Sequence, residues 1–304
     1  MLEPVNRKSA EPVQNEFSAS EIRDLYIRFA DLKDRMLFVE THKEAGEMLK
    51  SLLQRREKGE VRHIKPTEIF PGYEGYHGTY NVSHDHISRI IPGYQAPAAE
   101  LLELRKKIAA ENYGTMPGSE AATAIEITRA LRPRTIFEIG TNKGILLKAL
   151  MQYAPEDCFA ISMDLPYSQW GEAKYPFDAN QKDYVKFDES RIGEEIRNNQ
   201  ELNSRAVLVA GDSGRFDFSH FYGLMDLVVV DGNHTYENAR HDLEEGLKLV
   251  SPGGVLLIDD VNKPFRLEGV TLAVLEQTYK EGKVFYYANH KDGPDGNLAF
   301  YINS

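Results

Sequence analysis

Acidic residues stand at or beside the ends of five apolar runs in this 304-residue chain, and a histidine follows one of them. The run LVVV ends in Asp231, and His234 lies three residues further on. Carboxylates bind cations and accept hydrogen bonds from hydroxyl and amino groups, and a histidine can take up a proton near neutral pH. A single aspartate after a strand is often only the N-cap of the next helix. Acids beside all five runs are better explained by a shared ligand. The other acids of this set are Glu138, Asp164, Asp212, Asp259 and Asp260.

The elements that must position these residues follow from the alternation along the chain. An amphipathic helix (GSEAATAIEITRALR) precedes the first apolar run, and helical stretches separate most of the others. Such alternation predicts a parallel sheet that is covered by helices on both faces. The two last runs, KVFYYA and NLAFYIN, flank a Gly/Pro/Asp turn and read as a hairpin. The predicted fold class is therefore α/β, a Rossmann-like, doubly wound and mostly parallel sheet that ends in an antiparallel hairpin.

The first run leads into a glycine turn, FEIGTNKG, which opens a helix. Glycines let a ligand approach the backbone closely. The turn contains Gly140, Thr141, Asn142 and Gly144, and Asn142 stands where a dinucleotide fingerprint has its second glycine. Glu138, just before the turn, would repel a pyrophosphate. The motif therefore favours a ligand that carries positive charge or an amine.

The next two strand ends predict contacts to a nucleoside, because ligands of open α/β sheets bind at the carboxyl ends of the strands. Asp164 comes roughly 20 residues after the glycine turn, where an acid can hold both ribose hydroxyls. Asp212 and Ser213 follow the third strand and are expected to meet an adenine amino group.

This constellation resembles the class I S-adenosylmethionine-dependent methyltransferases over residues 113–304. Within that class, DGNHTYENARHDLEEGLKLVSPGGVLLIDDV is similar to metal-dependent O-methyltransferases that act on sugars, natural products and catechols. The resemblance implies that the cofactor is held by Glu138, Gly140, Thr141, Asn142, Gly144, Asp164, Asp212, Ser213 and Asp231. It also implies a divalent metal, expected to be Mg²⁺, on Asp231, Asp259 and Asp260. The position three residues after the first metal ligand is the general base in that group, and here it is His234.

Elementary electrostatics supports this set. Three converging carboxylates repel one another unless a cation neutralises them, and oxygen-only ligands favour Mg²⁺. A hydroxyl beside the cation loses its proton more easily, and a histidine, whose ordinary pKa is about 6.5, can accept it. Three alternatives remain open: Asp260 or His234 only begins a helix, the methyltransferase needs no metal, or the protein binds the cofactor without catalysis.

Composition restricts the partners. A formal net charge of −11 argues against a general nucleic-acid surface, and no apolar run approaches the length of a membrane span. Cys158 is the only cysteine, and it begins an apolar run, so we expect a buried thiol and a reducing cytoplasm. The first residues lack the apolar core of a signal peptide.

The N-terminal third carries no motif that we can assign to a function. Residues 1–17 are expected to form a flexible tail, and residues 18–112 a mainly helical region with helices over 22–36, 44–58 and 97–112. Their apolar faces must be buried, which predicts an acceptor site for a small hydroxylated molecule or a contact in a homo-oligomer. Two further interpretations concern the domain at 113–304. Tyr167, Trp170 and Tyr175 are expected to form either a lid over the substrate or a surface excursion with one packed aromatic residue, and His241 is expected to face solvent.

Overall fold

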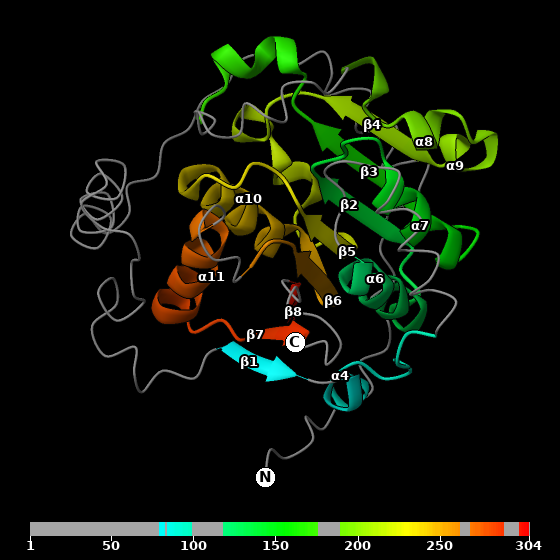
Figure 1. The fold of residues 1–304 in the computed structure, drawn as a ribbon, viewed down its shortest axis with the longest axis vertical. Helices are drawn as coiled ribbons and strands as arrows, with labels where there is room; N and C mark the ends of the chain where they lie inside the picture. Colours follow the sequence, from blue (N-terminus) through cyan, green and yellow to red (C-terminus); the bar gives the residue numbers. More distant parts are fainter. Residues whose placement is uncertain are drawn as a thin grey trace.

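An eight-stranded sheet forms the centre of the protein, with the strand order β1-β7-β8-β6-β5-β2-β3-β4 (Figure 1). The structure is a computed structural model, and it describes residues 79–82, 84–98, 118–175, 189–261, 268–288 and 298–303. Only β8 runs antiparallel to its neighbours. The strands are β1 (Thr79–Val82), β2 (Thr135–Ile139), β3 (Phe159–Asp164), β4 (Ala206–Ala210), β5 (Met225–Val230), β6 (Val250–Ile258), β7 (Phe285–Ala288) and β8 (Ala299–Ile302).

Helices cover both faces of this sheet, and each face has its own apolar cluster (Figure 1). The helices α10 (Tyr236–Leu249) and α11 (Glu268–Glu281) and the 3-10 turn η6 (Phe218–Phe221) cover one face. The helices on the other face are α4 (His84–Ile90), α6 (Gly118–Leu131), α7 (Ile145–Tyr153), α8 (Glu194–Arg197) and α9 (Gln200–Ser204). Successive strand residues point into opposite clusters, as in Ile136 and Phe137 of β2. The remaining described elements are the 3-10 turns η2 (Tyr167–Glu172), η4 (Glu189–Arg191) and η5 (Ser213–Arg215).

The predicted fold class is confirmed. All five apolar runs form neighbouring parallel strands, and β7 and β8 form the antiparallel pair, although their connection at 289–297 lies outside the described residues. The thiol of Cys158 is fully buried, as expected. One strand was not expected: β1 pairs in parallel with β7 at the edge of the sheet. Its four residues stand in a stretch rich in Gly, Tyr and His that has no strand or helix period.

Most of the N-terminal predictions fall outside the described residues. This holds for the tail at 1–17 and for the expected helices at 22–36, 44–58 and 97–112, apart from residues 97 and 98. The described part of this region, 79–98, packs on the domain through Ile87, Ile91 and Tyr94. Its proposed role in acceptor binding or oligomerisation therefore stays a prediction. Within the described ranges, none of the helices is long and apolar enough to cross a membrane.

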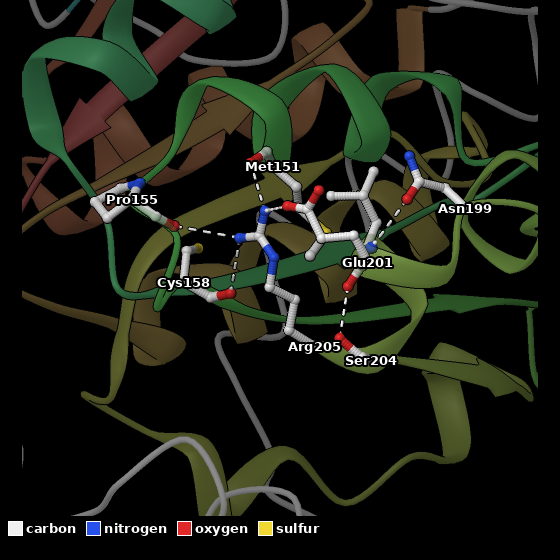
Figure 2. A network of polar contacts seen from close by, with 8 residues as sticks. Met151, Pro155, Cys158, Asn199, Glu201, Ser204 and Arg205 are labelled. Atoms are coloured by element: carbon white, nitrogen blue, oxygen red, sulfur yellow. Dashed lines mark hydrogen bonds and ion pairs between the residues drawn. The ribbon is translucent and has the colours of Figure 1, made fainter.

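A cationic side chain fastens the connection between α7 and β3, at the end of the strands opposite the predicted site. The guanidinium of Arg205 donates to the carbonyl oxygens of Pro155 at 3.2 Å, Cys158 at 3.3 Å and Met151 at 3.3 Å, and it lies 3.2 Å from the carboxylate of Glu201 (Figure 2). A cation at the end of a helix satisfies carbonyl groups that the helix itself leaves unpaired.

We predict that Arg205→Ala lowers the free energy of unfolding by about 1.5–3 kcal/mol, because it removes hydrogen bonds from a charged donor to three carbonyl groups. Glu201→Ala is the matched control. Its carboxylate is 73% exposed, so its loss should cost less than about 1 kcal/mol. Urea denaturation of both variants measures the difference, and equal losses would contradict the assignment of Arg205 as the fastening group.

Candidate functional site

The carboxyl ends of β2, β3, β4, β5 and β6 bring the predicted residues to one edge of the sheet, and Gly140 is where two of these ends touch. Gly140 has a φ of 103°, and a Cβ atom placed on it would lie 1.9 Å from the carbonyl oxygen of Asp231. The contact is possible only because glycine has no side chain. The glycine turn and the strand end that carries Asp231 are therefore in direct backbone contact.

The glycine turn continues into α7 with the amide of Asn142 turned toward Asp164. Gly144 begins the helix with a φ of 81°, and Asn142 also adopts a positive φ of 47°. The backbone N–H of Asn142 donates to Asp164 Oδ2 at 2.5 Å. Asp164, the predicted ribose ligand, is thus held at the tip of β3 by the turn that is predicted to wrap the cofactor.

Glu138 lies beneath this turn and is 1% exposed. Ser162, its neighbour in the β2–β3 register, donates a short hydrogen bond to its carboxylate. The hydroxyl groups of Ser162 and Thr141 are 2.6 Å apart. A chain of three polar side chains therefore connects the buried acid to the cofactor turn. Ser162 was missed in the sequence, although a serine inside the otherwise apolar FAISMD was the signal that could have revealed it.

Burial makes ionisation of these acids costly. It raises the pKa of Glu138 to about 8, although the hydrogen bond from Ser162 opposes the shift, and the negative charges of Asp231 and Asp164 add to it. Burial likewise raises the pKa of Asp164 to about 6, against the hydrogen bonds from the backbone of Asn142 and Leu165. A ligand with positive charge would relieve both costs. The residues present therefore fit S-adenosylmethionine, which carries a sulfonium and an ammonium group.

The loop after β4 binds a neighbouring segment through Asp212. One carboxylate oxygen of Asp212 accepts the N–H of Gly214 at 2.9 Å, and the other accepts the N–H of Lys174 at 2.7 Å. Arg215 adds a second contact between the same two segments, because its guanidinium donates to the carbonyl oxygen of Glu172 at 2.7 Å. Both oxygens of Asp212 already accept backbone donors, so its predicted contact with an adenine amino group would have to share one of them.

The interpretation of His241 as a solvent-facing residue is wrong. Its ring is partly buried, Nε2 lies 3.0 Å from the carbonyl oxygen of Ser213, and its centroid is 5.4 Å from that of Tyr175. Burial lowers its pKa. His241 therefore supports the predicted adenine-side loop from beneath.

The three aromatic residues of the predicted lid divide into two pairs of contacts. Tyr167 and Trp170 pack edge to face with centroids 5.1 Å apart, and the indole N–H donates to the carbonyl of Leu165 at 3.2 Å. Tyr175 lies instead against Gly214, where an added Cβ would come within 2.9 Å of its ring. Contact with a substrate stays a prediction.

The turn after β5 brings together a histidine and two carboxylates. Nε2 of His234 lies 3.1 Å from Asp260 Oδ2 and 3.9 Å from Asp231 Oδ1. One ligand atom from each of these three residues lies within 4.8 Å of the others. Among the described residues, this is the arrangement that fits a metal ion, and it includes His234 in place of Asp259.

The backbone explains the position of His234. Thr235, not His234, is the N-cap residue of α10, so the alternative that His234 begins the helix is not observed. The first turn of α11 packs directly on this segment, since a Cβ on Gly269 would lie 2.3 Å from the carbonyl oxygen of His234. Asp260 adopts a φ of 61°, in the left-handed region. Asp259, the residue before it, is 3% exposed.

Comparison with known proteins agrees with this geometry. Residues 137–261 match a family model described as a methyltransferase domain. The matched range runs from β2 to the residues after β6, so it contains the glycine turn, the predicted ribose and adenine contacts and the His234 turn. The match and the strand order agree with the predicted resemblance to class I methyltransferases over this range. No curated protein sequence matches the chain.

Several solved structures are similar at low identity. An O-methyltransferase of Bacillus cereus is 16% identical with a TM-score of 0.44, over 72% of this chain and 96% of that one. The O-methyltransferase TomG of Streptomyces achromogenes is 15% identical with a TM-score of 0.44, over 73% and 96%. A putative caffeoyl-CoA O-methyltransferase of Staphylococcus aureus is 12% identical with a TM-score of 0.47, over 67% and 92%. The fold assignment rests on the strand order of this protein, because these scores are below 0.5.

We predict that Glu138→Gln raises the stability of the ligand-free protein by an amount that depends on pH. The folded-state pKa of Glu138 lies above its ordinary value of 4.5, so its ionisation opposes folding. This cost is absent below pH 4.5, grows as the pH rises toward 8, and is constant above that. Thermal unfolding from pH 5 to pH 9 should show that the difference in melting temperature, variant minus parent, increases as the pH rises toward 8.

The matched control for this prediction is Glu195→Gln, which removes a half-buried carboxylate that pairs with Lys148 at 2.6 Å. Its effect should be small and nearly independent of pH. If the stability difference between Glu138→Gln and the parent also stayed constant between pH 5 and pH 8, the raised pKa assigned to Glu138 would be wrong.

Proposed function

We propose that this protein is an S-adenosylmethionine-dependent O-methyltransferase that acts on a hydroxyl group of a small molecule, with His234 as the general base. The observation that carries the proposal is the contact of His234 with Asp260 at 3.1 Å, at the strand ends beside the glycine turn. A carboxylate beside an imidazole stabilises the positive charge that the ring gains when it takes up a proton, which suits a general base.

The cofactor is assigned to the glycine turn and its neighbours. Gly140, Thr141, Asn142 and Gly144 would surround its amino acid part, with Glu138 beneath them. Asp164 would accept the ribose hydroxyls, and Asp212 and Ser213 would flank the adenine. Asp231 would lie near the methyl group. S-adenosylmethionine, when bound, supplies an electrophilic methyl group.

His234 would take the proton from the acceptor hydroxyl, which makes the oxygen nucleophilic. Asp260 fixes the ring through Nε2 and stabilises the positive charge that the ring gains. The turn cannot shift easily, because Gly269 packs against the carbonyl of His234 and Gly140 packs against that of Asp231. The chain's contribution is therefore positioning and electrostatics, which suits a group transfer in which two reactants must be aligned.

A divalent cation fits the same place. Asp231 and Asp260 offer oxygen ligands, Asp259 is the third predicted ligand, and an ion such as Mg²⁺ prefers carboxylates to an imidazole. When bound, the ion supplies positive charge that stabilises a deprotonated hydroxyl. The second candidate is a metal-independent methyltransferase, which the direct contact of Asp260 with His234 favours.

The acceptor is assigned only by class: a hydroxyl of a sugar, a phenol or another natural product. A role in natural-product biosynthesis, a homo-oligomeric assembly and a cytoplasmic location belong to the same proposal.

We predict that His234→Ala lowers the rate of methyl transfer by roughly 10²–10⁴-fold, the usual contribution of a positioned base. Binding of S-adenosylhomocysteine, measured by calorimetry, should stay close to that of the parent. A panel of hydroxylated acceptors with labelled S-adenosylmethionine finds the substrate, and single-turnover transfer then measures the chemical step. His220→Ala is the control, since His220 pairs with Asp217 at 3.6 Å in η6. A near-parental rate in His234→Ala would contradict the proposed base.

Chelation separates the two candidates in the same assay. If a divalent ion orients the acceptor, EDTA should abolish turnover, leave most of the cofactor affinity, and be reversed by Mg²⁺. Asp231→Ala should then be more harmful than Asp260→Asn, because an amide oxygen can still bind the ion. Full activity in EDTA would eliminate the metal and leave the metal-independent enzyme.

A further inference from the structure

A buried carboxylate that the function above does not use lies beneath the two halves of the site. Asp242, in the second turn of α10, is 1% exposed. Burial raises its pKa to about 7, and the charges of Asp212 and Glu245 act in the same direction. Because an apolar side chain here would avoid the cost of burying a carboxyl group, the reason for an aspartate must lie in what it holds.

On one side, Asp242 holds the loop that follows β4. The side chain of Ser213 lies beside the carboxylate of Asp242 and holds the pKa of that carboxyl below the value that burial alone would give. The next residue in the loop, Gly214, is held by Asp212 through its N–H at 2.9 Å. His241, beside Asp242 in the helix, binds the carbonyl oxygen of the same Ser213 at 3.0 Å. The first two turns of α10 thus bind both the side chain and the backbone of Ser213.

On the other side, Asp242 holds the turn that carries Asp231 and His234. Its Oδ2 atom lies so close to Gly232 that a Cβ placed there would be 2.9 Å away. With its amide nitrogen turned toward its acceptors, Asn238 donates to Asp242 Oδ2 at 3.0 Å and to the carbonyl oxygen of Asn233 at 3.2 Å. The carboxylate therefore fixes two consecutive residues of the turn, Gly232 by contact and Asn233 through Asn238.

We propose that Asp242 is a positioning residue that joins the adenine-side loop to the His234 turn, so that cofactor binding and the placement of the base depend on one another. The inference rests on the proposed function, since it takes Ser213 as a cofactor residue and His234 as the base. One buried carboxylate lies between the two segments, with Ser213 on one side and Gly232 and Asn238 on the other, so losing it frees both segments at once.

The test measures cofactor affinity in the full chain. Asp242→Ala should weaken binding of S-adenosylhomocysteine by about tenfold or more, and Asp242→Asn, which keeps one acceptor oxygen, by less. Ser213→Ala should weaken binding in the parent but add little in the Asp242→Ala background, since its partner is already gone. Additive losses in this double-mutant cycle would overturn the inference.

The His234 turn has its own measurement. Amide hydrogen exchange in residues 232–235 and in residues 212–215 should accelerate together in ligand-free Asp242→Ala. Acceleration in one segment alone would overturn the coupling. If Asp242→Ala does not fold, Asp242→Asn carries the same comparison.

Glu245→Ala is the matched control. Glu245 lies one turn further along α10, is 9% exposed and binds the hydroxyl of Tyr222 at 2.6 Å, away from both segments. It should lower stability and leave cofactor affinity within about twofold. A comparable loss of affinity in Glu245→Ala would mean that Asp242 acts only through general stability, which overturns the inference. If the parent protein binds no S-adenosylhomocysteine, the proposed function itself is overturned. If the parent and Asp242→Ala bind it equally well, only the inference is overturned.

Discussion

The cost of burying carboxylates at one edge of the sheet is the constraint on which the rest of the site depends. Glu138, Asp164 and Asp231 raise one another's free energy because they are close together and shielded from water. A fold does not gain stability from such an arrangement. It becomes favourable when a ligand brings positive charge, so the electrostatics of the ligand-free protein already specifies the kind of molecule that belongs there.

Rigid strands make this arrangement possible. The parallel register places Ser162 directly beside Glu138, and β5 lies between β2 and β6, so Asp231 comes close to both the cofactor turn and Asp260. The strand interiors are almost completely buried on both faces, which fixes the positions of their tips. The predicted site residues therefore stand at or just beyond the ends of buried strands.

The sequence predicted what depends on local pattern and on general topology. Apolar runs between helices define parallel strands, and parallel strands place their final residues at one edge, so the convergence of Glu138, Asp164 and Asp231 was predictable. The contact between Ser162 and Glu138 was not, because it depends on the strand register. Nor was the role of Asp242, since a polar residue on a helix reads as exposed until the packing of the helix is known.

Two adjacent aspartates show the same limit at finer scale. Asp259 and Asp260 were both candidate ligands, yet it is the carboxylate of Asp260, whose backbone adopts a left-handed φ, that lies beside His234. Residue order cannot reveal such a choice of direction. The short β1 strand was not predicted for another reason. Its four residues, at the edge of the sheet, are too few to show an alternation of apolar and polar side chains.

The close approach of Gly140 to Asp231 has a consequence for how such an enzyme can change over time. A new cofactor preference is most easily sought by varying the glycine turn, and a new acceptor by varying the turn after β5. Here the two turns share one backbone contact with no free space, so a side chain introduced at position 140 would displace the strand tip that carries Asp231. With the function proposed above, specificity for the cofactor and for the acceptor would therefore not be separately adjustable at position 140.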